Sequence, residues 1–287
     1  MVINVLTLSG LIIFITSFGL TLLLVKFGKT QVQRMWMLFN ISVCVWGLGT
    51  WGIGWASDPF WIEVSWKTAI CGGLAIGLSN YLTVHFLTGL ANRILLITVC
   101  AYTVLFMALT LAGQTLHHFR LLFGTFYFPS ADVSYTVMVA SYMILVVGTF
   151  LKLAQYYRNT TGALHTQSGF LLFGTLIGYV GGLSVLVPAF GILIYPAGNF
   201  SIAVYAAVVT YAILKHQMLD LEVIIRRTLI FSALFTTVIV IYSLTLTFIE
   251  WLMGKYLGLS PLASSLAVVA IVFFAYVLIK GIKSLKK

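Results

Sequence analysis

The sequence predicts an all-α membrane protein, a polytopic helix bundle, and three observations support this fold class. Of the 287 residues, 61% are hydrophobic and only 8% are charged, and the mean hydropathy is +1.08. A water-facing surface needs roughly a quarter to a third of its residues to be charged, so a soluble fold is excluded. The few charges also leave long uncharged intervals, as expected where an ionised side chain at the bilayer centre costs at least ~2.5 kcal/mol.

Uncharged intervals of about 20 residues mark the candidate membrane spans. The interval 159–214 is too long for one crossing, and a helix-breaking cluster around Pro188, Gly191, Pro196 and Gly198 divides it in two. The intervals predict nine transmembrane helices, at residues 5–25, 35–56, 68–90, 94–113, 134–154, 168–188, 198–215, 228–250 and 261–280. Between the fourth and fifth helices, the segment 114–133 is rich in Phe, Tyr and His, and we expect it to rest on the membrane surface or to cover the bundle.

The basic residues orient these spans, because they collect in cytoplasmic loops. With the N-terminus outside, the inner segments hold 13 basic and 2 acidic residues, and the outer segments hold 3 basic and 4 acidic residues. The opposite orientation would reverse this asymmetry. We therefore expect an outside N-terminus and a cytoplasmic C-terminus. The formal net charge of +10 then reflects topology, and no nucleic-acid partner is expected.

The stretch 215–228 differs from its apolar surroundings. At 100° per residue its apolar side chains fall on one face and its charged side chains on the other. Glu222 and Arg226 are spaced for an i,i+4 pair. This pattern predicts an amphipathic helix at the cytoplasmic interface. It joins a seven-helix domain, residues 1–214, to two further helices and a short basic tail, residues 229–287. Asp220, Glu222, Arg226 and Arg227 are candidates to relay a signal, although a simple connector is equally allowed.

Few residues suggest chemistry. Acidic residues lie no deeper than helix ends, the three cysteines have no paired spacing, and the adjacent His117 and His118 lack a third metal ligand. We therefore expect no catalytic residue, no metal, no cofactor and no enzymatic activity.

The ligand-binding candidates are polar or aromatic groups near the outer loops and within one span. They are Trp55, Trp61, His85, Tyr195 and Asn199. The tryptophans fit either an interfacial belt or an aromatic-lined mouth for an apolar or amphipathic ligand. His85 fits either a structural hydrogen bond between helices or a proton-sensing role.

Small residues repeat every four positions along the sixth predicted helix, at Gly174, Gly178 and Gly182. This spacing allows helix backbones to approach closely, so these glycines are expected to pack against another helix. The sequence leaves open whether the glycines of the second and third helices meet this face or leave space for a ligand.

Several motifs in order along the chain resemble the seven-helix N-terminal membrane region of bacterial sensor histidine kinases, including those that detect peptide pheromones. The motifs are His85-Phe-Leu-Thr-Gly89, Phe123-Gly-Thr-Phe-Tyr-Phe-Pro129, Gly178-Tyr-Val-Gly-Gly182, Val187-Pro-Ala-Phe-Gly191, Tyr195-Pro-Ala-Gly-Asn199 and the segment from Tyr211 to Thr228. The resemblance covers roughly residues 5–235. It implies a bacterial plasma-membrane protein that senses an extracellular or membrane-borne stimulus and relays it inward.

The chain departs from such kinases at its C-terminal side, because no phosphoacceptor-histidine helix and no glycine-rich ATP lid follow the last predicted helix. It is expected to be either a fragment of a longer sensor or a stand-alone receptor-like protein. We therefore expect a sensory module in the lipid bilayer that acts through a cytoplasmic kinase or through self-association, with a peptide or an apolar small molecule as ligand. The alternatives are a small-molecule or lipid transporter without ion coupling, and a non-catalytic accessory membrane subunit.

Overall fold

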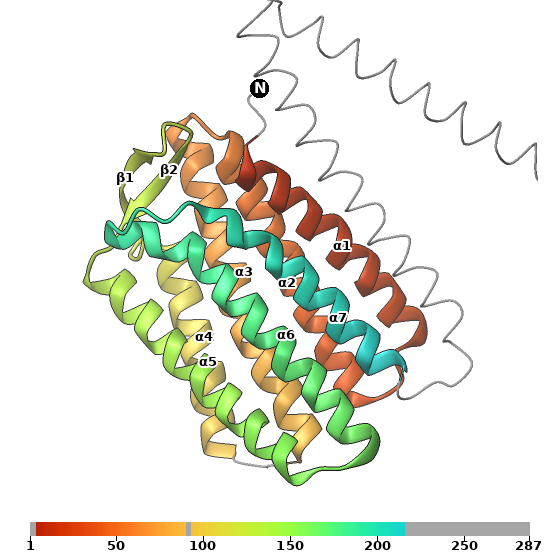
Figure 1. Ribbon diagram of the computed structural model, residues 1–287. Helices are drawn as coiled ribbons and strands as arrows, with labels where there is room; N and C mark the ends of the chain where they lie inside the picture. The colour runs from red at the N-terminus through yellow and green to blue at the C-terminus, as the bar shows by residue number, and fades with distance from the viewer. Residues whose placement is uncertain (1–3, 90–92, 216–287) are drawn as a thin grey trace, which may run out of the picture. The chain divides into compact units, whose positions relative to one another are not determined.

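The computed structural model describes residues 4–89 and 93–215, and Figure 1 shows their arrangement. This part of the chain is an α-helical bundle with one short β-hairpin. In chain order its elements are α1 (Val5–Phe27), α2 (Gln31–Trp55), α3 (Pro59–Thr88), α4 (Arg93–Leu111), β1 (His117–Leu122), β2 (Phe126–Ser130), α5 (Val133–Asn159), α6 (Gly162–Leu186), the 3-10 turns η1 (Val187–Phe190) and η2 (Pro196–Phe200), and α7 (Ser201–Lys215).

Seven helices in the described residues are long and apolar enough to cross a membrane, which confirms the prediction of seven apolar helices in this region. Two of them include a 3-10 turn, so these spans run over Gly162–Phe190 and Pro196–Leu214. The predicted eighth and ninth helices and the predicted amphipathic linker lie outside the described residues.

Helices α1, α2, α3 and α5 begin at capping side chains, and several helices begin earlier than expected. Thr30 and Gln33 form a reciprocal capping box at the start of α2. Asp58 accepts a hydrogen bond of 2.9 Å from the backbone of Phe60, so α3 begins at residue 59 and not at 68. The first turns of α3 carry an ion pair of 2.7 Å between Glu63 and Lys67. The charged residues thus mark where the apolar interval of α3 begins, whereas the capping residue marks where the helix begins. Helix α6 also begins earlier than expected, at 162 and not 168, although this start lies within the uncharged interval 159–214.

Six helices form a closed ring, and the seventh lies outside it. Around the ring α1 packs against α2, α2 against α3, α3 against α5, α5 against α6, α6 against α7, and α7 against α1. The central pairs approach closely through glycine: a Cβ at Gly49 on α2 would overlap the backbone of Ala69 on α3. Helix α4 packs against α3 and is anchored to α5 by a 2.9 Å hydrogen bond from the Tyr102 hydroxyl to the Met138 carbonyl.

The segment between α4 and α5 forms an antiparallel β-hairpin, which the sequence did not predict. Phe126 and Phe128 of β2 are fully buried, and the Trp66 indole on α3 donates a hydrogen bond of 2.7 Å to the Tyr127 carbonyl. A backbone hydrogen bond of 2.9 Å from Ala131 to the Ala189 carbonyl ties the same region to η1. The hairpin therefore covers one end of the bundle, which is one of the two placements expected for this aromatic segment (Figure 1).

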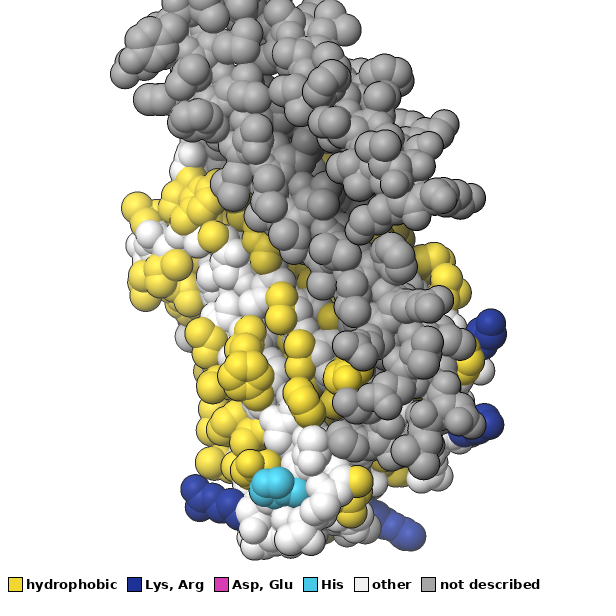
Figure 2. All heavy atoms as spheres, turned by 45° about the vertical axis from the view of Figure 1, so that its right-hand side comes forward, with side chains coloured by type: hydrophobic (Ala, Val, Ile, Leu, Met, Phe, Trp, Pro, Cys, Tyr) yellow, Lys and Arg dark blue, Asp and Glu magenta, His cyan; other side chains and the backbone are white. Residues whose placement is uncertain are grey.

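The surface of the bundle is divided by residue type. Figure 2 shows hydrophobic side chains over the visible flank and Lys and Arg side chains at its lower and right-hand edges. Large apolar side chains on the outside of the bundle are strongly exposed: Ile94 on α4 is 79% exposed and Ile144 on α5 is 75% exposed. An apolar belt of this extent would be unfavourable in water and is favourable in lipid.

Candidate ligand site inside the bundle

An apolar cavity of about 60 Å³ lies where α2, α3, α5, α6 and α7 meet. Its wall includes Leu74 of α3, Met138 of α5, Gly182 of α6 and Ile202 of α7. The contributing residues come from the first half of α5 and the last third of α6. The cavity therefore lies in the half of the bundle nearer the hairpin.

Tyr205 on α7 connects the cavity wall to three other helices, α2, α3 and α6. Its ring lines the cavity and makes edge contacts with the rings of Trp36 and Phe39 on α2, at centroid distances of 5.5 and 5.0 Å. Its hydroxyl donates a hydrogen bond of 2.9 Å to Asn80 Oδ1 on α3 and lies 3.0 Å from Thr175 Oγ1 on α6. Such hydrogen bonds between helices hold a polar tip inside an apolar bundle.

The glycine repeat of α6 makes room for the Tyr205 ring. A Cβ at Gly174 would lie 2.6 Å from Tyr205 Cδ2, and a Cβ at Gly178 would overlap the same ring. Gly182 is less constrained, because a Cβ there would meet only Ile202, at 3.3 Å. The predicted packing role of the three glycines thus has a specific partner, which is α7. The glycines of α2 and α3 do not meet this face: Gly49 and Gly72 lie in the contact between α2 and α3, and Gly73 lines the cavity.

Asn199 is the one predicted ligand residue that lies at the centre of a polar junction. It is fully buried and accepts a hydrogen bond of 2.9 Å from Trp46 Nε1 on α2, and its amide donates one of 2.8 Å to Ser9 Oγ on α1. Trp46 also lines the cavity. Ten residues earlier on α2, Trp36 Nε1 donates a hydrogen bond of 2.8 Å to Thr210 Oγ1, which joins α2 to α7.

The other predicted ligand residues are dispersed. The rings of Trp55 and Trp61 lie 6.1 Å apart and both are exposed beside the turn between α2 and α3. Tyr195 is exposed and its ring lies 5.3 Å from Phe123 of the hairpin region. His85 is half-buried in the last turn of α3, with Tyr81 and Phe86 as ring neighbours. The structure therefore does not bring these five side chains into one pocket. The relay candidates Asp220, Glu222, Arg226 and Arg227 lie outside the described residues.

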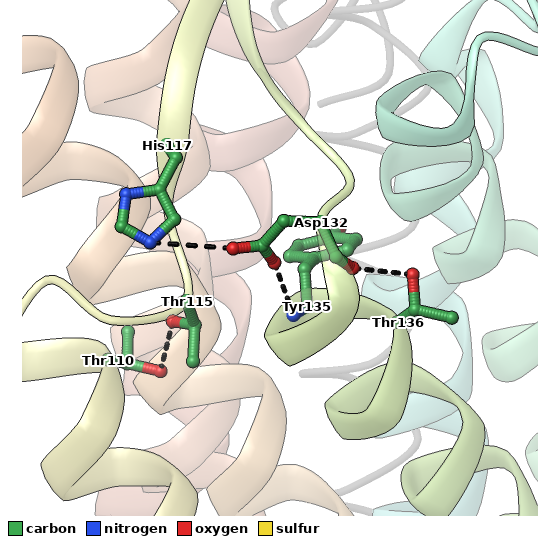
Figure 3. Close-up of polar contacts among 6 residues, drawn as sticks. All are labelled: Thr110, Thr115, His117, Asp132, Tyr135 and Thr136. Carbon is green, nitrogen blue, oxygen red and sulfur yellow. Dashed lines mark hydrogen bonds and ion pairs between the residues drawn. The ribbon is translucent and has the colours of Figure 1, made fainter.

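A second polar cluster lies at the hairpin end of the bundle, where Figure 3 shows His117 of β1 facing Asp132, the N-cap residue of α5. His117 Nε2 lies 3.4 Å from Asp132 Oδ2, and the other oxygen of this carboxylate accepts a hydrogen bond of 2.7 Å from the backbone of Tyr135. Beside it, the Thr115 hydroxyl donates a hydrogen bond of 2.9 Å to Thr110. The His117 and Asp132 side chains are partly exposed, and within the described residues no group of three His, Cys, Asp or Glu side chains could hold a metal ion.

Sequence reasoning missed four of the residues that matter most here. These are Trp46, Tyr142, Tyr179 and Tyr205, which all line the cavity. The sequence signal that pointed to them was the small-residue spacing of α6, because a row of glycines on a membrane helix leaves a groove that a side chain of the partner helix occupies. The sequence does not show that this side chain is a tyrosine 27 positions beyond Gly178.

Neither a family model, nor a curated protein, nor a solved structure matches this chain. The class of protein is therefore defined by the fold and the site themselves. The described chain is a mostly helical bundle whose seven apolar helices indicate a multi-pass membrane protein, and it contains a small, partly open apolar cavity bordered by hydrogen bonds between helices.

Proposed function

We propose that this chain is a sensory module of the bacterial plasma membrane, without enzymatic activity of its own. It detects an extracellular or membrane-borne ligand and relays the signal to a cytoplasmic kinase, to another partner or through self-association. The observation that carries the proposal is the position of Tyr205, which forms part of the cavity wall and of α7 at once. Helix α7 leads directly into the predicted amphipathic linker.

A ligand in the cavity has a direct mechanical route to α7. Filling the space beside the Tyr205 ring changes its contacts with Asn80 and Thr175, which hold α7 against α3 and α6. Because packed interiors respond by discrete rearrangement and not by continuous deformation, such a change favours a shift of the whole helix. The ligand needs only to bind one arrangement of α7 better than the other.

The charge distribution supports the orientation that this proposal requires. Among the described residues, the end of the bundle with the α1–α2, α3–α4 and α5–α6 turns carries basic residues and no acidic ones. These basic residues are Lys26, Lys29, Arg34, Arg93, Lys152 and Arg158. The hairpin end carries Asp58, Glu63 and Asp132 beside Lys67 and Arg120. By the positive-inside rule the hairpin end faces outward, and α7 ends on the cytoplasmic side.

The test is a crosslinking experiment on the full chain in its native membrane. A photo-crosslinker is placed at position 219, and the captured cytoplasmic protein is quantified for the wild type, for Tyr205→Phe and for Tyr156→Phe. Tyr156 is a half-buried tyrosine of α5 remote from the cavity wall. We expect one defined partner whose yield changes with Tyr205→Phe and not with Tyr156→Phe. No capture at all, or identical yields for all three chains, would contradict the relay.

The transporter alternative makes a different demand on the bundle. Transport requires passage through its whole length, whereas this cavity lies in the half nearer the hairpin. Flux of a small apolar solute into vesicles that contain the purified chain separates the two functions. Flux above that of empty vesicles would favour transport over sensing.

A further inference from the structure

We infer that the cavity takes the hydrocarbon chain of a membrane-dissolved amphiphile, which reaches it sideways from the half of the bilayer nearer the hairpin. This inference names the ligand class of the proposed sensory site and rests on that function for its signalling meaning. The binding itself is a separate claim, argued from the wall, the size and the surroundings of the cavity.

The wall of the cavity presents only apolar surface, although several lining residues carry polar atoms. Trp46 Nε1 donates to Asn199, and the Tyr205 hydroxyl donates to Asn80. The Tyr179 hydroxyl has no hydrogen-bond partner among the described residues, but it is buried and adds no polar area to the wall. A polar headgroup inside would lose its water without gaining a hydrogen bond, which is costly. A hydrocarbon chain has no polar group whose hydration would be lost, so the apolar wall favours it over a headgroup.

The volume also favours a chain over a compact ligand. At about 60 Å³ the cavity is well below the roughly 300 Å³ or more of pockets that enclose a drug-sized molecule. Apolar cavities remain dry, and an empty one costs the fold about 24 cal/mol per Å³. For this volume the cost corresponds to roughly a tenfold preference for a filled cavity. A stretch of alkyl chain fits such a space while the rest of the molecule stays in the bilayer.

Access from the water at the hairpin end is obstructed. The buried rings of Phe126 and Phe128 cover this end, and Arg120 Nη2 of β1 holds the carbonyls of Pro188 and Ala189 in η1 at 3.3 Å each. The side between α5 and α6 is different, because cavity-lining residues there are only half-buried. These residues are Val139, Met143 and Leu183. The cavity thus borders the apolar flank of the bundle, where lipid chains lie.

The experiment uses two photoactivatable probes of equal chain length, each with a diazirine at mid-chain. One is a free fatty alcohol and the other is a phosphatidylcholine, so the two arms distinguish a single-chain amphiphile from a bulk phospholipid. The full chain is reconstituted in phosphatidylcholine vesicles, irradiated with each probe and digested, and the labelled residues are identified by mass spectrometry. Labels on Met138 and Tyr142, which are 2% and 8% exposed, report the cavity. Labels on Ile144 and Val147, which are exposed, report the surrounding lipid.

Matched variants separate cavity binding from surface contact. Gly182→Leu places a side chain in the cavity, and Val139→Phe fills it from the α5 side if the first variant fails to fold. Gly148→Leu is the control, because a Cβ at Gly148 meets nothing within 4 Å. We expect labelling of Met138 and Tyr142 in the wild type and in Gly148→Leu, with a roughly tenfold loss in the cavity-filled variants. Labelling of Ile144 should not change.

The outcomes distinguish this inference from the proposed function. Labelling confined to Ile144 and Val147 in every variant would overturn the inference, and if the position 219 crosslink still responds to Tyr205→Phe the sensory proposal stands. Labelling of Met138 and Tyr142 without any effect on that crosslink would support the chain-binding cavity and contradict the sensory role. A label from the alcohol alone would identify a single-chain ligand, and a label from both probes would identify any lipid chain.

Discussion

The indole of Trp46 donates a hydrogen bond of 2.9 Å to the side-chain oxygen of Asn199, and this contact joins α2 to η2 across 153 positions of sequence. Both residues are buried, and the amide of Asn199 continues the connection to Ser9 on α1. Three segments far apart in the chain therefore meet at one side chain. Because Trp46 also borders the cavity, the same junction supports the candidate site.

Breaking this junction should destabilise the bundle. Asn199→Ala removes the acceptor of Trp46 and the donor to Ser9, whereas Trp46→Phe removes only the indole N–H donor and keeps an aromatic ring. Hydrogen bonds between membrane helices contribute about 0.6 kcal/mol on average and up to about 1.7 kcal/mol. We expect each variant to lower the free energy of unfolding in mixed micelles. The double variant should cost less than the two single costs added together. Strict additivity would show that the two side chains act independently.

The close packing of α6 against Tyr205 leads to a second prediction. Gly178→Ala should cost about 1–3 kcal/mol, because a Cβ at this position overlaps the Tyr205 ring. Gly148→Ala on α5 is the matched control, since its Cβ meets open space and alanine favours the helix by up to about 1 kcal/mol. Thermal unfolding of the two variants in one detergent should therefore move in opposite directions. A stabilising Gly178→Ala would show that α6 and α7 can separate without cost.

The helices could be predicted from sequence because their cause is local. Exposed apolar side chains such as Leu22 and Ile144 suit a lipid environment only within a continuous apolar stretch of about 20 residues. Such stretches are visible directly in the sequence. The helix starts were less accurate because the charges of Glu63 and Lys67 were taken as the limit of α3. A helix continues past its apolar interval until a capping residue ends it, and Asp58 is that residue here.

The site was less predictable because its causes are not local. The sequence marked Asn199 as a candidate, but its partners Trp46 and Ser9 lie 153 and 190 positions away. The cavity is the space that the side chains of five packed helices leave unfilled. Its position therefore depends on the size and rotamer of every side chain around it. Trp55 was named as a ligand candidate and is exposed, whereas Trp46, which was not named, is buried in the junction.

The hairpin end gives a third prediction, which concerns the two roles of Asp132. As the capping residue of α5 it accepts a 2.7 Å hydrogen bond from Tyr135, and as an anion it lies 3.4 Å from His117. Asp132→Ala should cost about 1 kcal/mol through the lost cap. Asp132→Asn keeps a good capping group and changes only the partly exposed contact with His117, which is an ion pair only when His117 is protonated, so it should cost between about 0 and 1 kcal/mol. Equal losses in thermal stability for the two variants would assign the effect to the charge and not to the cap.

Orientation in the membrane is the fourth prediction, and it can be tested by labelling single cysteines. Cys44, Cys71 and Cys100 are first replaced by serine or alanine, and single cysteines are then introduced near positions 58 and 125, at the hairpin end, and near 30 and 160, at the opposite end. A thiol reagent that cannot cross the membrane is applied to intact cells and to inverted vesicles.

The expected labelling follows from the charges at the two ends. The turns at 30 and 160 lie beside Lys29 and Arg158, and that end has no acidic residue among those the structure describes, so the positive-inside rule places them in the cytoplasm. We expect positions 58 and 125 to react in intact cells and positions 30 and 160 only in inverted vesicles. The reverse pattern would turn the cavity and Tyr205 toward the cytoplasmic half of the bilayer and would remove the route for an outside stimulus.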